Sequence, residues 1–260
     1  MVILAIGDIV GPSGCEHVTK VLPLLRKKYS IDMVMANGEN SAEGNGATPG
    51  SVKLLFDAGV NVITGGNHIL RRRHVYRALQ RKNGLIRPAN YHSTAPGAGW
   101  FVYDHPEHRV CVVNLQGVAF MQNIGCPFDC IDKILEEADT PNIIIDFHAE
   151  ATAEKLCMGY YLDGRVTAVL GTHTHVPTAD AGILPNGTAY VTDLGMCGGR
   201  NSVLGVKAPL AVERARTNLP VFFEVDTEDI RLSGALLDVD EKTGKCREIK
   251  QLLYIGLDNV

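Results

Sequence analysis

The segment that most restricts how this chain can fold is a pair of histidines placed directly after an apolar stretch. The apolar residues Val166–Leu170 predict a buried β-strand, and His173 and His175 follow it within five residues. On extended backbone, side chains at positions i and i+2 point to the same side. The two imidazoles can therefore hold one metal ion, or one each of two neighbouring ions.

Four other strand-length apolar runs also lead into side chains that bind metals. Val2–Ile6 precedes Asp8, Met33–Ala36 precedes Glu39 and Asn40, Val62–Thr64 precedes Asn67 and His68, and Ile143–Phe147 precedes His148. Ligands in open α/β sheets bind outside the carboxyl ends of the strands. One histidine after a strand is more often structural, but core packing does not explain such side chains at all five ends. We therefore predict that they form one site.

Strand-like runs alternate with helical patterns over the first two thirds of the chain, which indicates a parallel or mixed sheet covered by helices. The predicted helices are Cys15–Lys28, which Pro23 should kink or divide, a helix from the N-cap Thr48 to Gly59, and three more at Arg72–Lys82, Pro127–Ala138 and Ala151–Tyr161. The sequence thus favours an α/β protein.

The last third of the chain is richer in strand patterns. Strands are predicted at Ala189–Thr192, Pro220–Val225, Arg231–Val239 and Arg247–Tyr254, with one helix near Ala208–Arg216 and a hairpin turn at Thr243-Gly244. These strands could complete a second sheet, so we predict two sheets packed face to face with helices outside. No linker, repeat or low-complexity segment interrupts the chain, and residues 1–260 are predicted to form a single domain.

Composition narrows the classes of function. The net charge of −4 gives no overall basic field that would attract nucleic acid. No apolar run approaches the roughly 20 residues of a membrane span, and the first residues lack the pattern of a secretory signal. The seven cysteines show no framework spacing, and Cys126 and Cys130 are too far apart for a C-x-x-C motif. We therefore expect a cytoplasmic protein without a membrane partner.

The candidate ligands combine oxygen and nitrogen donors. They are the carboxylates of Asp8 and Glu39, the imidazoles of His148, His173 and His175, and the amide oxygens of Asn67 and Asn40. This mixture suits manganese, iron or zinc. It exceeds what one tetrahedral zinc uses, so two ions bridged by one carboxylate are favoured. Paired ions of this kind clamp a phosphoryl group and activate a water or hydroxide in many phosphatases and nucleases.

His68 follows Asn67 directly, so it borders the predicted ions without having to bind them. A histidine in that place can protonate the leaving alkoxide near neutral pH. The alternative is that His68 only forms a hydrogen bond that orients a ligand.

The motifs together resemble the calcineurin-like metallophosphoesterases, and within them the YmdB-like family. The resemblance rests on Gly7-Asp8-Ile9-Val10-Gly11, Ala36-Asn37-Gly38-Glu39-Asn40, Gly66-Asn67-His68, Arg87-Pro88-Ala89-Asn90-Tyr91, Asp146–Thr152 and the His173/His175 segment, and covers nearly the whole chain. It implies a four-layer α/β/β/α sandwich with two mixed sheets, bacterial and cytoplasmic location, a homo-oligomer, and phosphodiesterase activity on 2′,3′-cyclic nucleotides.

The resemblance also implies how the ligands divide between two divalent ions, with iron or manganese favoured over zinc. Asp8 and His175 would hold one ion, with Asn40 completing or supporting its site. Asn67, His148 and His173 would hold the other ion, Glu39 would bridge the two, and His68 would donate the proton. These assignments are carried over onto the matching motifs of this chain.

Two features differ from the superfamily pattern. Asp8-Ile9-Val10 lacks the histidine of an Asp-x-His motif, which the YmdB-like branch also lacks. An aromatic residue and an acid usually follow the Gly-Asn-His motif, whereas here Arg71, Arg72 and Arg73 follow. Arg73, Arg77 and Arg81 are spaced to line one helix face, and they either attract a phosphorylated or RNA-end substrate or form a solvated surface paired with acids. We favour the solvated surface.

Other functions and residues are weaker candidates. The same site could belong to a metal-containing regulator that binds a nucleotide or RNA, or to a phosphomonoesterase or nuclease. Asp180 or Asp193 could orient a ligand histidine, and Gly195–Gly199 is expected to be an irregular loop near the site. The serines Ser41, Ser93 and Ser202 lack a nucleophile-elbow context, which argues against a serine hydrolase.

Overall fold

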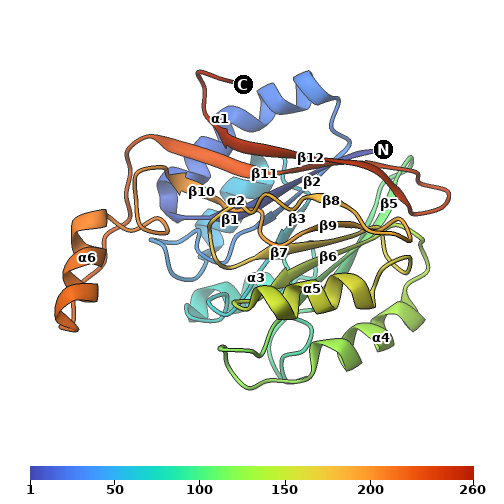
Figure 1. Cartoon of the computed structure of the whole chain (residues 1–260), viewed down its shortest axis with the longest axis horizontal. Helices are drawn as coiled ribbons and strands as arrows, with labels where there is room; N and C mark the ends of the chain where they lie inside the picture. Colours follow the sequence, from blue (N-terminus) through green and yellow to red (C-terminus); the bar gives the residue numbers. More distant parts are fainter.

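A computed structural model describes residues 1–260 and shows two six-stranded sheets stacked face to face with helices outside (Figure 1). The first sheet has the order β12-β11-β10-β1-β2-β3. Its strands are β1 (Val2–Ile9), β2 (Met33–Asn37), β3 (Val62–Thr64), β10 (Met196–Gly199), β11 (Ile230–Val239) and β12 (Cys246–Ile255). Strands β1, β2, β3 and β10 run parallel, and β11 and β12 add an antiparallel edge.

The second sheet has the order β4-β5-β6-β7-β9-β8. Its strands are β4 (Trp100–Asp104), β5 (Arg109–Gln116), β6 (Ile143–His148), β7 (Ala168–Thr172), β8 (Gly182–Ile183) and β9 (Ala189–Val191). Strands β5, β6, β7 and β9 are parallel, while β4 and β8 are antiparallel at the two edges. Both sheets are therefore mixed, as predicted.

The helices cover the outer faces of the two sheets. On the side of the first sheet lie α1 (Gly11–Tyr29), α2 (Pro49–Asp57), η1 (Arg73–Val75) and α3 (Tyr76–Gln80). On the second sheet lie α4 (Pro127–Glu137) and α5 (Thr152–Tyr161). Helix α6 (Ala208–Thr217) projects away from the body of the molecule (Figure 1). None of the helices has the length and apolar composition needed to cross a membrane.

Three separate apolar cores explain the layered order. One core joins the outer face of the first sheet to α1 and α2, a second lies between the sheets, and a third joins the second sheet to α4 and α5. Alternate residues of β1 serve different cores, since Leu4 and Ile6 pack under α1 while Ile3 and Ala5 face the other sheet. The four-layer α/β/β/α arrangement is thereby confirmed.

Several local predictions were right. Helices α2, α4, α5 and α6 and strands β9, β11 and β12 match the predicted ranges to within a few residues. Thr48 caps α2 by accepting a hydrogen bond from the Ser51 backbone N–H at 3.1 Å. Gly244 has φ +72° in the turn between β11 and β12, a conformation that glycine adopts at little cost.

Other local predictions were wrong. Of the two predicted effects of Pro23, a kink or a division, the division does not occur, because burial of Val21, Leu22 and Leu25 on the inner face of α1 holds the helix together. The predicted helix Arg72–Lys82 is shorter, with η1 followed by α3. Pro220–Val225 forms only an isolated bridge from Val225 to Val206, because a strand needs a longer neighbouring strand, and Phe222 is 97% exposed instead.

The segment Gly195–Gly199 is not an irregular loop, and most of it forms strand β10 between β1 and β11. The neighbouring strand β1 approaches it closely at Gly7, where an added Cβ would meet the Gly195 carbonyl oxygen at 2.0 Å. The hairpin of β4 and β5 was not predicted at all.

Candidate metal centre

The candidate site lies where the carboxyl ends of strands from both sheets meet. Strands β1, β2 and β3 of the first sheet and β6 and β7 of the second all end at this place. They contribute Asp8, Glu39, Asn40, Asn67, His68, His148, His173 and His175, which the contacts below connect into one cluster. Every candidate ligand from the sequence is therefore part of the same cluster.

Asp8 reaches the cluster because strand β1 contains a bulge. The pairing of β1 with β2 shifts register between Ile6 and Asp8, so Gly7 is the extra residue. A shift of one residue moves the next side chain to the opposite face of the sheet. Asp8 therefore faces the space between the sheets, while Ile9 returns to the core under α1. The apolar pattern alone would have placed Asp8 on the wrong face.

Glu39 is fully buried and lies at the centre of the cluster. Its Oε2 accepts a hydrogen bond from the His68 backbone N–H at 2.6 Å, and its Oε1 lies 3.2 Å from Nε2 of His148. Burial alone would raise the pKa of Glu39, but the charge of His148 and their hydrogen bond hold it well below the ordinary value. The lowered pKa favours the anionic form of Glu39, which makes it a candidate ligand for a cation.

His148 connects Glu39 to two further candidate ligands. Its Nε2 lies 2.9 Å from Oδ1 of Asn67 and 3.0 Å from Nδ1 of His173. Glu39, His148 and His173 form a group whose ligand atoms lie within 4.8 Å of one another and could hold a metal ion. Burial opposes protonation of His148, yet the charge of Glu39 outweighs it and raises the pKa of His148 to about 9.

Asp8 and His175 form the other side of the cluster. Nε2 of His175 lies 3.5 Å from Oδ1 of Asp8 and 3.3 Å from Nδ2 of Asn40. Oδ1 of Asp8 is buried and has no hydrogen-bond partner. A buried, ionised oxygen without a partner is costly, and a cation would satisfy it. The residues present therefore fit metal ions, with two carboxylates, three imidazoles and the amide oxygen of Asn67 as donors, while Asn40 directs its Nδ2 to His175 and its Oδ1 to His68.

The backbone of the histidine pair differs from the prediction. His173 and His175 lie beyond the end of β7 and have φ angles of +101° and +64°, so they are not on extended backbone. Such angles are unusual for residues other than glycine and are found mainly at functional sites. Both side chains still reach the cluster. They are directed there by the turn after β7 and not by the alternation of side chains along a strand.

Asp193 holds that turn in place. Its Oδ2 accepts hydrogen bonds from the backbone N–H and the hydroxyl of Thr174, at 3.1 and 2.8 Å, between the two histidines. The prediction that Asp193 orients a ligand histidine thus has a structural basis. Asp180 accepts from Thr178 and Thr192 instead, and it makes no hydrogen bond to the cluster.

A second chain of hydrogen bonds, which the sequence patterns did not predict, supports the cluster. Nδ1 of His148 lies 2.9 Å from the hydroxyl of Thr172, which in turn donates to Asp146 at 2.6 Å. Burial raises the pKa of Asp146 to about 6. Asp146 stands two residues before His148 on β6, so the i, i+2 spacing was the available signal. This chain fixes the orientation of the His148 ring.

His68 lies at the edge of the cluster. Its Nδ1 is 2.8 Å from Oδ1 of Asn40 and 3.3 Å from Oε1 of Glu39, and its side chain is 29% exposed. It lines a cavity of about 650 Å³ together with Glu39, Asn40, His173 and His175. The exposed part of the imidazole is therefore accessible to a molecule bound in the cavity.

The far wall of this cavity comes from a segment that the sequence did not associate with the site. Leu204–Val206 and Phe223–Val225, which flank α6, line the cavity opposite the strand ends. The Leu204 carbonyl oxygen lies 3.0 Å from Nδ1 of His175. The α6 segment thus both shapes the cavity and orients one candidate ligand.

Asp193 also pairs with a buried lysine, and this gives a prediction about stability. Nζ of Lys155 lies 2.8 Å from Oδ2 of Asp193, and both side chains are almost fully buried. Replacing Lys155→Met should lower the free energy of unfolding by about 3–5 kcal/mol, since the Asp193 charge would stay buried without its partner. Urea denaturation measures this. Lys53→Met, which breaks the exposed Lys53–Asp57 pair, should change it by less than about 1 kcal/mol. Equal effects would contradict the prediction.

Comparisons with known proteins agree with this geometry. A family model described as YmdB-like protein matches residues 4–252. The chain belongs to the YmdB-like family. A 2′,3′-cyclic-nucleotide 2′-phosphodiesterase from Bacillus subtilis is 43% identical over 255 residues, which cover 97% of each chain.

Two solved structures share the fold of this chain over nearly its whole length. A hypothetical protein from Thermus thermophilus has a TM-score of 0.91 and 38% identity, covering 97% of this chain and 98% of its own. A novel phosphatase from Mycoplasma pneumoniae has a TM-score of 0.90 and 33% identity, covering 97% and 92%. The resemblance drawn from the sequence motifs is therefore confirmed for this YmdB-like chain.

Proposed function

We propose that this YmdB-like protein is a phosphodiesterase that hydrolyses 2′,3′-cyclic nucleotides at the cluster. The observation that carries the proposal is the convergence of carboxylates, amides and imidazoles on one wall of a cavity of about 650 Å³. That volume is in the usual range for small-molecule sites. The name of the B. subtilis relative supports the choice of substrate.

The donor set supports two divalent ions, with iron or manganese favoured over zinc. Asp8 and His175 would hold one ion with help from Asn40, and Asn67, His148 and His173 would hold the other, with Glu39 shared between them. When bound, such ions neutralise charge on the phosphoryl group and supply a nucleophile. The chain's own contribution is to fix these donors through Asp146, Asp193 and the Leu204 carbonyl.

His68 is proposed as the general acid. The hydrogen bond between Nδ1 and Asn40 orients the ring, and the exposed part of the ring faces the cavity. From there it can give a proton to the ribose oxygen that leaves phosphorus, which would otherwise depart as an alkoxide. Opening of the cyclic diester then yields a nucleoside monophosphate.

Cytoplasmic location and assembly into a homo-oligomer belong to the same proposal. All seven cysteines are free, which suits a reducing compartment.

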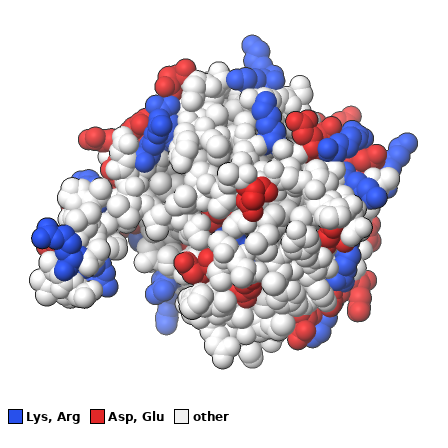
Figure 2. All heavy atoms as spheres, in the orientation of Figure 1, with Lys and Arg blue, Asp and Glu red and all other residues white.

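No residue of α6 is buried, and its projection carries basic side chains at its free end (Figure 2). A helix of this length is marginal in water without packing partners, which supports a contact between α6 and a second copy.

The decisive experiment is incubation of metal-loaded protein with 2′,3′-cyclic AMP, alongside a monoester and a short RNA. We expect a nucleoside monophosphate from the cyclic substrate and bound transition metal by elemental analysis. Tight metal-dependent binding without product would favour a regulator, and faster turnover of the monoester would favour a phosphomonoesterase. Either result would overturn the proposal.

A further inference from the structure

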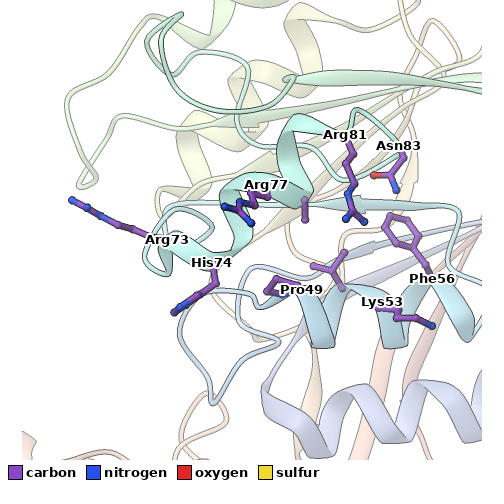
Figure 3. Close-up of a pocket in the computed structure, with 10 residues that line it drawn as sticks. Pro49, Lys53, Phe56, Arg73, His74, Arg77, Arg81 and Asn83 are labelled. Atoms are coloured by element: carbon purple, nitrogen blue, oxygen red, sulfur yellow. The ribbon is translucent and has the colours of Figure 1, made fainter.

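A second large cavity lies between helices α2 and α3, outside the metal centre. It has a volume of about 900 Å³ and is open to solvent. Its charged and polar lining residues are Lys53, Arg73, His74, Arg77, Arg81 and Asn83 (Figure 3). No aspartate or glutamate lines it, so its lining carries a net positive charge, although Lys53 pairs with Asp57 and the whole chain has a net charge of −4. We call this cavity the cationic groove.

The arginines of the cationic groove have no acidic partners. Arg73, Arg77 and Arg81 form no ion pair, whereas the neighbouring Arg72 pairs with Glu43 at 3.0 Å. The sequence favoured a solvated surface on which these arginines pair with acids. The part of that interpretation that concerns the acidic partners is therefore wrong. Unpaired cations that share a concave surface repel one another, and an anionic ligand would relieve that repulsion.

The arginines are spread along the groove and do not converge. Arg77 and Arg81 are four residues apart at α3, which corresponds to an advance of about 6 Å along a helix. Arg73 extends away at the other end (Figure 3). A compact anion such as free phosphate would contact only one or two of them. A chain of phosphates would contact all of them.

The groove also offers apolar surface between its charges. Phe56 of α2 is half-buried and lines the groove at the same end as Arg81 and Asn83, and Pro49, Val52 and Ala78 add to the apolar wall. Single-stranded nucleic acids are bound by this combination of a positively charged groove with aromatic rings on which bases stack. A binding site for a purely inorganic polyanion would not need the aromatic ring.

Arg72 lies between the cationic groove and the metal centre. Its Nε donates to the Asn45 carbonyl oxygen at 2.8 Å, and its guanidinium pairs with Glu43. Asn45 and Glu43 both line the cavity of the metal centre, while Arg73, the next residue after Arg72, lines the groove. The groove and the metal-centre cavity share no lining residue, but the contacts of Arg72 place the Arg73 end of the groove beside the Glu43–Asn45 wall of the cavity.

We propose that the cationic groove binds single-stranded RNA whose 3′ end carries a 2′,3′-cyclic phosphate. The terminal cyclic phosphate would lie in the metal-centre cavity beside His68, and the preceding nucleotides would follow Arg73, Arg77 and Arg81. The inference rests on the proposed function, because it extends that substrate from a free nucleotide to an RNA end. Hydrolysis of the terminal diester consumes one water and leaves a phosphomonoester on the RNA.

The test compares two substrates in the native protein and in Arg77→Ala/Arg81→Ala. The substrates are 2′,3′-cyclic AMP and a single-stranded RNA of about five nucleotides with a 2′,3′-cyclic phosphate end. Each lost phosphate contact weakens binding in a salt-dependent way, so we expect KM for the RNA to rise roughly 10-fold or more in the variant. The kcat for both substrates and the KM for cyclic AMP should stay unchanged.

The matched control is Lys242→Ala/Lys245→Ala, which removes the same charge from the turn between β11 and β12. It should leave the KM for the RNA unchanged. A similar rise in the control would mean that overall charge sets the affinity, and the groove would then have no special role. Equal KM values for RNA and cyclic AMP in the native protein would also overturn the proposal.

A binding measurement separates this inference from the proposed function. Fluorescence anisotropy with a labelled RNA that ends in a 3′-phosphate needs no turnover. We expect the slope of log Kd against log salt to fall by roughly 1.4 in the arginine variant, for two lost phosphate contacts on a single strand. If cyclic AMP is not hydrolysed but this slope falls, only the proposed activity fails. If the slope is unchanged, the groove does not bind RNA.

Discussion

Replacing His68→Ala is expected to lower kcat for 2′,3′-cyclic AMP by roughly 10²–10⁴-fold, the usual contribution of a general acid. Metal content should not change, because His68 touches the cluster only through Oδ1 of Asn40, Oε1 of Glu39 and its own backbone N–H. Steady-state kinetics and elemental analysis of the purified variant measure the two quantities.

The choice of leaving group distinguishes a catalytic His68 from a positioning one. A 4-nitrophenyl phosphodiester releases a phenolate that needs no proton, so the loss in the variant should be much smaller with it than with the cyclic nucleotide. An equal loss on both substrates would show that His68 only orients Asn40 and Glu39. His68→Asn is a second variant that keeps a hydrogen-bonding side chain but carries no titratable proton.

Replacing Glu39→Gln should reduce metal affinity by more than roughly 100-fold and abolish activity with it. Even the outer partners of metal ligands contribute 10–100-fold to affinity, and Glu39 lies at the centre of the cluster, 3.2 Å from His148. The glutamine keeps the shape and the acceptor for the His68 N–H but loses the charge. Calorimetric titration with Mn²⁺ measures the affinity independently of activity.

Glu43→Gln serves as the matched control for this experiment. Glu43 lines the same cavity, but its side chain is 77% exposed and pairs with Arg72. Its loss should leave the affinity for Mn²⁺ within about twofold of native, since exposed pairs contribute little. Native Mn²⁺ affinity in the Glu39 variant would remove Glu39 from the proposed ligand set.

The order of elements and the approximate place of the site could be predicted from the sequence because both depend on local patterns. Apolar runs of strand length predicted β1, β2, β3, β6 and β7, and the residues at their carboxyl ends predicted the cluster. Pro220–Val225 shows the limit of such patterns. Only Val225 pairs, in an isolated bridge to Val206, and without a longer partner strand the segment became part of an exposed arm and a wall of the cavity.

The tertiary structure decided how the side chains are aimed. The register shift at Gly7 sends Asp8 to the face between the sheets, and the turn held by Asp193 aims His173 and His175. It also decided that Arg73, Arg77 and Arg81 share a groove without acids. The sequence by itself determined which donors are present and which strands carry them. Their convergence needed contacts between residues more than a hundred positions apart, which no local pattern encodes.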